Sequence, residues 1–297
     1  MRILAQNKWP WRMHATYDET ISRALDVFEK VHAEMPIDGL HWFFDHAETI
    51  SERSMDRIAA LGGGVAVQHR MAYQGEYFVE RYGARAAEAT PPVARMLDKG
   101  VRTSAGTDAT RVASYNPWVS LSWLITGRTV GGLQITPQRN CLSREAALRM
   151  WTENVTWFSN EEGLKGRIEV GQLADLVVPD RDFFSCPESD IADTTSLLTV
   201  VGGQVVWAAG GFASLDDRGP PPAMPDWSPV RRYGGYAAWG EQGRPLQATL
   251  RQAAAACACA RACELHGHGH ASAWASELPV SDLRSFWGAL GCACWAV

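Results

Sequence analysis

The fold is decided by residues 101–118, which read VRTSAGTDATRVASYNPW. A short β-prone run opens this stretch and ends at Gly106, and a carboxylate, Asp108, follows two residues later. Asn116 has the right chemistry for the N-cap of a helix, and Pro117 suits the first helical position. A carboxylate after a buried strand and before a helix stands where (β/α) barrels hold their catalytic groups. A lone Asp in GTD is more often a simple turn residue, so a functional role for Asp108 depends on whether other candidate residues share its position in the fold.

Three earlier units repeat this order of strand, polar residue and helix. Strand-like runs lead to His14, to His46 and to His69, and a helical pattern follows each of the first two. Strands that alternate with helical segments are typical of a parallel sheet with crossover helices, in which the carboxyl ends of the strands share one edge. A single histidine is more often a packed or solvent-facing ring than a ligand. Three histidines and Asp108 at equivalent positions favour a metal site.

Two helix starts carry the spacing of a capping box. Thr16 is followed three residues later by Glu19, and Thr49 by Glu52. Apolar residues recur at helical spacing after both pairs. The sequence therefore predicts that one helix starts just after Thr16 and another just after Thr49.

Composition excludes several classes of function. The chain has 297 residues, a net charge of -5, 46% hydrophobic and 21% charged residues, which is an ordinary globular balance. We expect no nucleic-acid partner, because there is no basic footprint, and no membrane partner, because no run reaches the roughly 18 apolar residues of a membrane span. The first residues lack the apolar core of a signal peptide. A cytoplasmic location is the default expectation, although an upstream segment would carry any targeting signal.

The chain divides into three parts that differ in their residue patterns. Residues 1–165 hold the repeated strand and helix units, and residues 166–213 hold β-branched runs with Gly-Gly and Gly-Gln turns, which predict a small β module. Residues 214–297 read as an irregular segment and a Cys/His-rich tail. That tail contains five of the seven cysteines and an HGHGH run, so metal binding, disulfides and a compositionally biased terminus all stay open.

Seven motifs in a fixed order resemble the C-terminal half of amidohydrolase family 3, in the metal-dependent amidohydrolase superfamily. They are WRMHA, FDHAE, VAVQH, SAGTDA, REAALRMWTENVTWF, GRIEVGQLADLVVPD and TVVGGQVVW, and they lie within about residues 1–210. The resemblance implies an α/β fold, a partial TIM (β/α)8 barrel that contributes about strands five to eight. It also implies part of an accessory β-sandwich.

The same resemblance implies a divalent metal, usually Zn²⁺, that activates water for attack on an amide-like C–N bond. His14 then matches the histidine at the end of barrel strand five, His46 that of strand six, and Asp108 the aspartate of strand eight. The family role of this aspartate is metal ligand and general base. His69 stands where the family commonly has proline, and it is a candidate for contact with a small-molecule substrate.

This chain departs from the family at its front. It contains neither the HxH pair after strand one nor the lysine of strand four. We therefore expect a truncated or partial chain that needs a missing N-terminal half or forms a homo-oligomer, since half a barrel exposes strand edges. Three ligands can still hold zinc.

Three functions remain open at this point. The first is a metal-dependent hydrolase acting on carbon–nitrogen bonds other than peptide bonds. The second is a non-catalytic remnant or partner protein with a metal-binding Cys/His tail. The third, a phosphotriesterase-like barrel hydrolase, shares the rim ligands, but the GQLADLVV module argues against it. The substrate cannot be read from the sequence, because specificity in such barrels lies in rim loops.

Overall fold

The structure is a computed structural model that describes residues 1–109 and 112–216. The chain separates into two units, residues 1–217 and 218–297. From residue 217 on, the predicted irregular segment and Cys/His-rich tail lie outside the described residues. Within the described part, no helix is long and apolar enough to cross a bilayer.

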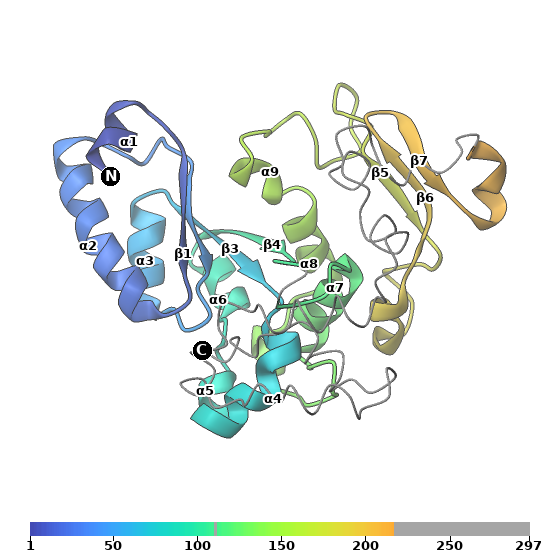
Figure 1. The fold of residues 1–297 in the computed structure, drawn as a ribbon, viewed down its shortest axis with the longest axis horizontal. Coiled ribbons are helices and arrows are strands. Elements are labelled where there is room, and N and C mark those ends of the chain that lie inside the picture. The colour runs from blue at the N-terminus through green and yellow to red at the C-terminus, as the bar shows by residue number, and fades with distance from the viewer. Residues whose placement is uncertain (110–111, 217–297) are drawn as a thin grey trace, which may run out of the picture. The chain divides into compact units, whose positions relative to one another are not determined.

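Four parallel strands form the central sheet (Figure 1). They are β1 (Trp11–Ala15), β2 (Trp42–His46), β3 (Gly64–Gln68) and β4 (Arg102–Gly106), and they lie side by side in sequence order. Neighbouring strands are in parallel register throughout. The prediction of an α/β fold with a parallel sheet is therefore confirmed, and all four carboxyl ends lie at one edge. Whether these strands are half of a closed barrel stays a prediction.

Helices connect and cover the strands. In Figure 1, α2 and α3 lie together beside β1. In chain order the helices are α1 (Arg2–Gln6), α2 (Asp18–Glu34), α3 (Glu52–Ala60), α4 (Met71–Tyr82), α5 (Ala84–Ala87), α6 (Val93–Asp98), α7 (Pro117–Thr126), α8 (Arg144–Trp151) and α9 (Val155–Phe158), with 3-10 turns η1 (Gln138–Asn140), η2 (Glu188–Asp193) and η3 (Gly210–Leu215).

The predicted helix cap is found at Asn116 but not at Thr16 or Thr49, and α2 begins after Tyr17, which makes no side-chain cap hydrogen bond. As predicted, Asn116 caps α7, because its Oδ1 accepts a hydrogen bond of 2.9 Å from the Trp118 amide and Pro117 stands first. The start predicted directly after Thr49 is wrong. Ser51 caps α3 instead, and the Thr49 hydroxyl accepts a hydrogen bond from the Asp18 amide at 3.2 Å. The Thr49 hydroxyl therefore makes a long-range hydrogen bond to the Asp18 amide and does not cap α3.

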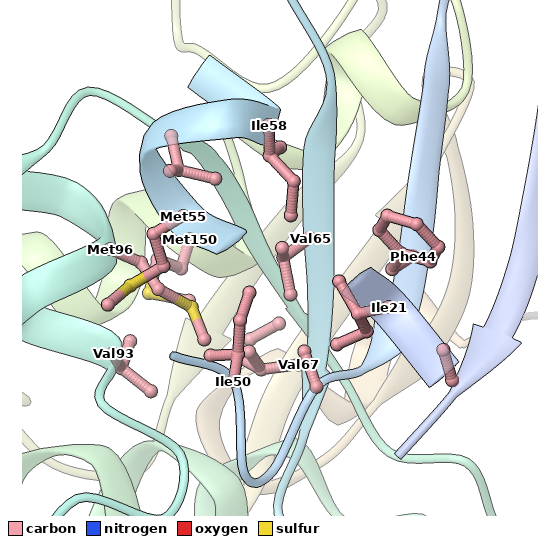
Figure 2. Close-up of a cluster of buried hydrophobic side chains, with 14 of the residues drawn as sticks. Ile21, Phe44, Ile50, Met55, Ile58, Val65, Val67, Val93, Met96 and Met150 are labelled. Carbon is pink, nitrogen blue, oxygen red and sulfur yellow. The ribbon is translucent and has the colours of Figure 1, made fainter. Parts of the chain in front are cut away.

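The hydrophobic core lies between the sheet and its helices (Figure 2). Val65 and Val67 alternate along β3, so both point to the same side, and both are fully buried. In the close-up, Met55 and Ile58 of α3 pack toward this side of the sheet. Residues on both sides of β3 are buried, with only Ala66 partly exposed, as is typical of a parallel sheet that is covered on both faces.

A second sheet is antiparallel and has three strands. It consists of β5 (Leu176–Pro179), β6 (Ser196–Val201) and β7 (Gln204–Ala208) in that order. Gly202 and Gly203 join the last two strands, and both have positive φ, as a two-residue hairpin turn requires. The β-branched runs thus form strands at 176–179 and 196–208, whereas residues 166–175 of the same predicted module form none.

Candidate metal centre

Two histidines meet at the carboxyl edge of the central sheet. The imidazole rings of His14 in β1 and His46 at the end of β2 have their centroids 4.5 Å apart, in edge-on geometry. An ion pair holds these strands together beside the rings, because Arg12 Nε donates to Asp45 Oδ2 at 2.9 Å. His14 and His46 are separated in the sequence by helix α2, and the parallel pairing of β1 with β2 brings their rings together.

The environment of His46 favours the neutral form of its ring. Burial lowers the pKa of His46, and the neighbouring His14 lowers it further, whereas Asp108 and Asp45 oppose the shift. Its Nδ1 is buried and has no hydrogen-bond partner among the described residues. A neutral imidazole with an unpaired nitrogen has the protonation state of a metal ligand.

Asp108 lies two residues beyond β4 in the left-handed region, with a φ of 51°. The Asp108 side chain is exposed, and its negative charge raises the pKa of both His46 and Glu48. Asp108 therefore lies on the same rim as these two residues, the rim being the carboxyl edge of the central sheet. The structure does not bring Asp108 into one tight cluster with the two histidines. Over residues 1–109 and 112–216, no three His, Cys, Asp or Glu side chains are grouped closely enough to hold a metal ion.

His69 lies deeper than the other candidates. Its ring is fully buried directly after β3, and its centroid is 5.7 Å from that of Tyr73. Burial lowers the pKa of His69, and the nearby carbonyl of Gly106 opposes that shift. Neither ring nitrogen makes a well-formed hydrogen bond within the described residues. The predicted contact between His69 and substrate stays a prediction.

Glu48 is a buried acid at this rim that the sequence did not single out. Burial raises its pKa to about 7, and the positive charge of Arg70 opposes the shift. One carboxylate oxygen, Oε2, is buried without a hydrogen-bond partner in the described part of the chain. Its place two residues after His46 is the signal that could have identified it, since rim residues follow strand ends.

Replacing Glu48 with glutamine is expected to make the metal-free protein more stable at alkaline pH. The folded state holds a proton on Glu48 up to about pH 7, while the unfolded chain releases it near 4.5. The wild type therefore loses stability as pH rises between those values, by on the order of 3 kcal/mol. Glutamine cannot ionise and removes this loss.

Urea denaturation in EDTA, at intervals from pH 4.5 to 8, measures this difference. The stability advantage of Glu48→Gln over the wild type should grow with pH and level off above about 7. Glu80, an exposed glutamate of α4, provides the matched control Glu80→Gln. A difference between wild type and Glu48→Gln that is constant with pH would contradict a buried, protonated Glu48.

A family assignment now follows from comparison with known proteins. A model of the amidohydrolase family matches residues 1–207, which include the central sheet, its carboxyl edge and all but the last residue of the second sheet. The chain belongs to the amidohydrolase family. The match places His14, His46 and Asp108 inside the family region, while residues 208–297 lie beyond it.

Individual relatives agree with this family assignment. The chain is 29% identical over 194 residues to an N-substituted formamide deformylase of Arthrobacter pascens, which covers 64% of this chain and 35% of the relative. It is 24% identical over 199 residues to the putative amidohydrolase YtcJ of Bacillus subtilis, covering 66% and 37%. The chain thus spans little more than a third of the length of these curated relatives.

A solved structure shares the fold. A metal-dependent hydrolase of uncharacterized function from Pyrococcus horikoshii superimposes with a TM-score of 0.51 at 21% identity, over 61% of this chain and 36% of that one. This likeness concerns the fold of the described α/β region.

Proposed function

We propose that this chain carries part of the active site of a metal-dependent hydrolase that acts on carbon–nitrogen bonds other than peptide bonds. The observation that carries the proposal is the contact between the rings of His14 and His46 at the carboxyl edge of a parallel sheet. That edge is where α/β barrels hold their chemistry. Membership of the amidohydrolase family supports the reaction class.

The donor types suit a divalent metal, for which we choose Zn²⁺, and binding would have to draw Asp108 toward the two rings, because these three described side chains are not closely grouped. His14 and His46 would hold it through imidazole nitrogens, and the buried, unpaired Nδ1 of His46 is an unused donor at this position. Asp108 is the third ligand that we propose, from the same rim. Two imidazoles and a carboxylate match the ligand types of catalytic zinc sites, which often have three protein ligands.

The reaction divides its tasks among the residues of the rim. The metal, when bound, supplies a Lewis acid next to the carbonyl group under attack. Asp108 accepts a proton from the attacking water and returns it to the leaving amine nitrogen, as a general base and then a general acid. Burial favours the neutral form of His46 by lowering its pKa, and His69 is the proposed contact for the substrate.

Small amides are the substrates to test. The Arthrobacter relative is named for N-substituted formamides, so these compounds come first. A small formamide would also fit a site that binds a small-molecule substrate. The activity is proposed for the whole catalytic unit, of which this chain supplies four βα units.

Metal content tests the metal site directly. The purified 297-residue chain is loaded with Zn²⁺, dialysed and analysed, beside His14→Ala, His46→Ala and the control His41→Ala. His41 precedes β2 at the opposite, amino edge of the sheet, with its ring stacked on Trp157. Each rim variant should lose one equivalent of zinc, or bind it on the order of a hundredfold more weakly.

The control separates the rim from other zinc-binding groups. Zinc held by cysteines or histidines elsewhere in the chain would remain in all four proteins. His41→Ala should match the wild type. If His14→Ala and His46→Ala also retained the full zinc content, the two imidazoles would not be ligands and the proposal would be wrong.

A further inference from the structure

Arg70 is a cation at the carboxyl edge of the central sheet that the proposed hydrolysis does not yet use. It lies two residues after the end of β3, and it is the N-cap residue of α4. The residue is partly buried. Its Nε donates a hydrogen bond of 2.7 Å to Oε1 of Gln74, one turn along the helix. This bond orients the guanidinium and leaves its two terminal nitrogens, Nη1 and Nη2, unused by the helix.

Groups at the ends of the two neighbouring strands respond to the charge of Arg70. Burial raises the pKa of Glu48 and of Tyr17, and the positive charge of Arg70 opposes both shifts. Burial lowers the pKa of His46, and Arg70 adds to the lowering. Tyr17 follows β1, whereas His46 ends β2 and Glu48 follows it. Because Coulomb interactions fade with distance, the guanidinium must lie near the carboxyl ends of three adjacent strands.

No counter-charge for Arg70 is found within residues 1–109 and 112–216. No carboxylate there forms an ion pair with its guanidinium, and the first turn of α4 holds no acidic residue. Arg57 of α3 shows the usual arrangement of a buried guanidinium, because it pairs with Asp26 and Glu29 at 2.6 Å each. A partly buried cation without such a partner has lost hydration and gained no ion pair. An anionic ligand at this position would supply the missing pair.

The position of Arg70 favours a bound anion over a purely structural role. The N-terminus of a helix carries a partial positive charge, so a cation there destabilises the helix, whereas an anion is stabilised by the guanidinium and the helix end together. Nη1 and Nη2 form a planar fork that matches the two oxygens of a carboxylate. Nearby, Glu48 Oε2 and both ring nitrogens of His69 are buried without a hydrogen-bond partner among the described residues. These atoms leave bonding capacity for other polar groups of the same ligand.

We propose that Arg70 binds a carboxylate of the substrate, so that the substrate is a small amide with an anionic group rather than a neutral one. The inference rests on the proposed hydrolase function. The formyl group of a formamide has no position for a carboxylate, which must then lie on the nitrogen substituent, as in an N-formyl amino acid. Water adds its oxygen to the formyl carbon, the C–N bond breaks with its electron pair on nitrogen, and both protons of the water end on that nitrogen. The products are formate and an amino acid.

Ligand binding to the metal-free chain tests the role of Arg70 without turnover. The purified 297-residue chain is stripped of metal with a chelator, which is then dialysed away, because a metal would itself bind a carboxylate. Isothermal titration calorimetry compares N-formylglycine with N-formylglycinamide, in which a neutral amide of nearly the same shape replaces the carboxylate. We expect the acid to bind at least about tenfold more tightly, since hydrogen bonds between charged groups are the stronger ones.

Arg70→Gln should remove this preference and leave the affinity for N-formylglycinamide within about twofold of the wild type. Arg128→Gln is the matched control and should keep the full preference. Arg128 also donates from Nε to a glutamine, Gln134 Oε1 at 3.0 Å, but it follows α7 and not β3. Circular dichroism shows whether each variant is folded, and the comparison of the two ligands on the wild type needs no variant.

Equal affinity of the wild type for both ligands, or no binding of the acid at about 10 mM, would overturn the proposal. So would a preference that persists in Arg70→Gln, or one that is lost equally in Arg128→Gln. The zinc content of His14→Ala and His46→Ala decides the metal site by itself. Zinc retained by those two variants would overturn the proposed metal site, whereas an absent acid preference would overturn only the role of Arg70.

Discussion

Asp108→Asn is expected to lower metal-dependent amide hydrolysis by about a thousandfold or more, the size of effect that follows loss of an essential general base. Asparagine has nearly the same shape as aspartate, but its amide cannot accept the proton of the attacking water at neutral pH. Because the Asp108 side chain is exposed, the substitution should leave folding stability unchanged. The loss would therefore report on chemistry.

The measurement is kcat/KM with the best small amide, on the chain together with any polypeptide that activity requires. Asp98→Asn, at an exposed carboxylate that ends α6, is the matched control and should retain full activity. Zinc content of the same preparations separates the two roles of Asp108. Full turnover by Asp108→Asn would remove this residue as the base, whereas lost turnover with retained zinc would identify it as the base rather than an indispensable ligand.

The architecture around the rim could be predicted because each signal for it is local. The strand that ends at Gly106, the cap at Asn116 and the proline after it occupy adjacent positions in the chain. Parallel strands then place their carboxyl ends at one edge for any sequence with this order. The meeting of His14 and His46 follows from that rule without further information.

The burial of individual side chains, and their contacts with residues distant in sequence, could not be predicted in the same way. The sequence placed His69 and Asp108 at equivalent positions, yet the structure buries the first completely and leaves the second exposed. The acidity of Glu48 depends on desolvation by residues distant in sequence, which no local motif encodes. Thr49 failed as a cap because Asp18, on another helix, takes its hydroxyl. Periodicity identifies the edge of the sheet on which a residue lies, and packing decides what that residue can do there.

Trp42→Ala is expected to destabilise the folded chain by about 3–5 kcal/mol, the cost of a large cavity at a fully buried aromatic site. The indole of Trp42 is 0% exposed, and its centroid lies 5.1 Å from that of Phe28 and 5.9 Å from that of Trp11. The backbone of Gly63 lies directly against the ring, where an added Cβ would come within 2.3 Å of it. Core side chains packed on several sides leave little freedom to collapse into the space.

Urea denaturation of the wild type, Trp42→Ala and Trp42→Phe measures the effect of this cavity. Phenylalanine keeps most of the aromatic surface and removes the indole N–H, which is buried without a partner among the described residues. Trp42→Phe should therefore cost only about 1–2 kcal/mol, clearly less than the alanine substitution. Since α2 reaches β1 and β2 through Phe28, the loss should also disorder the strands that hold His14 and His46. A cost below about 1 kcal/mol for Trp42→Ala would mean that the aromatic cluster does not hold the sheet to its helices.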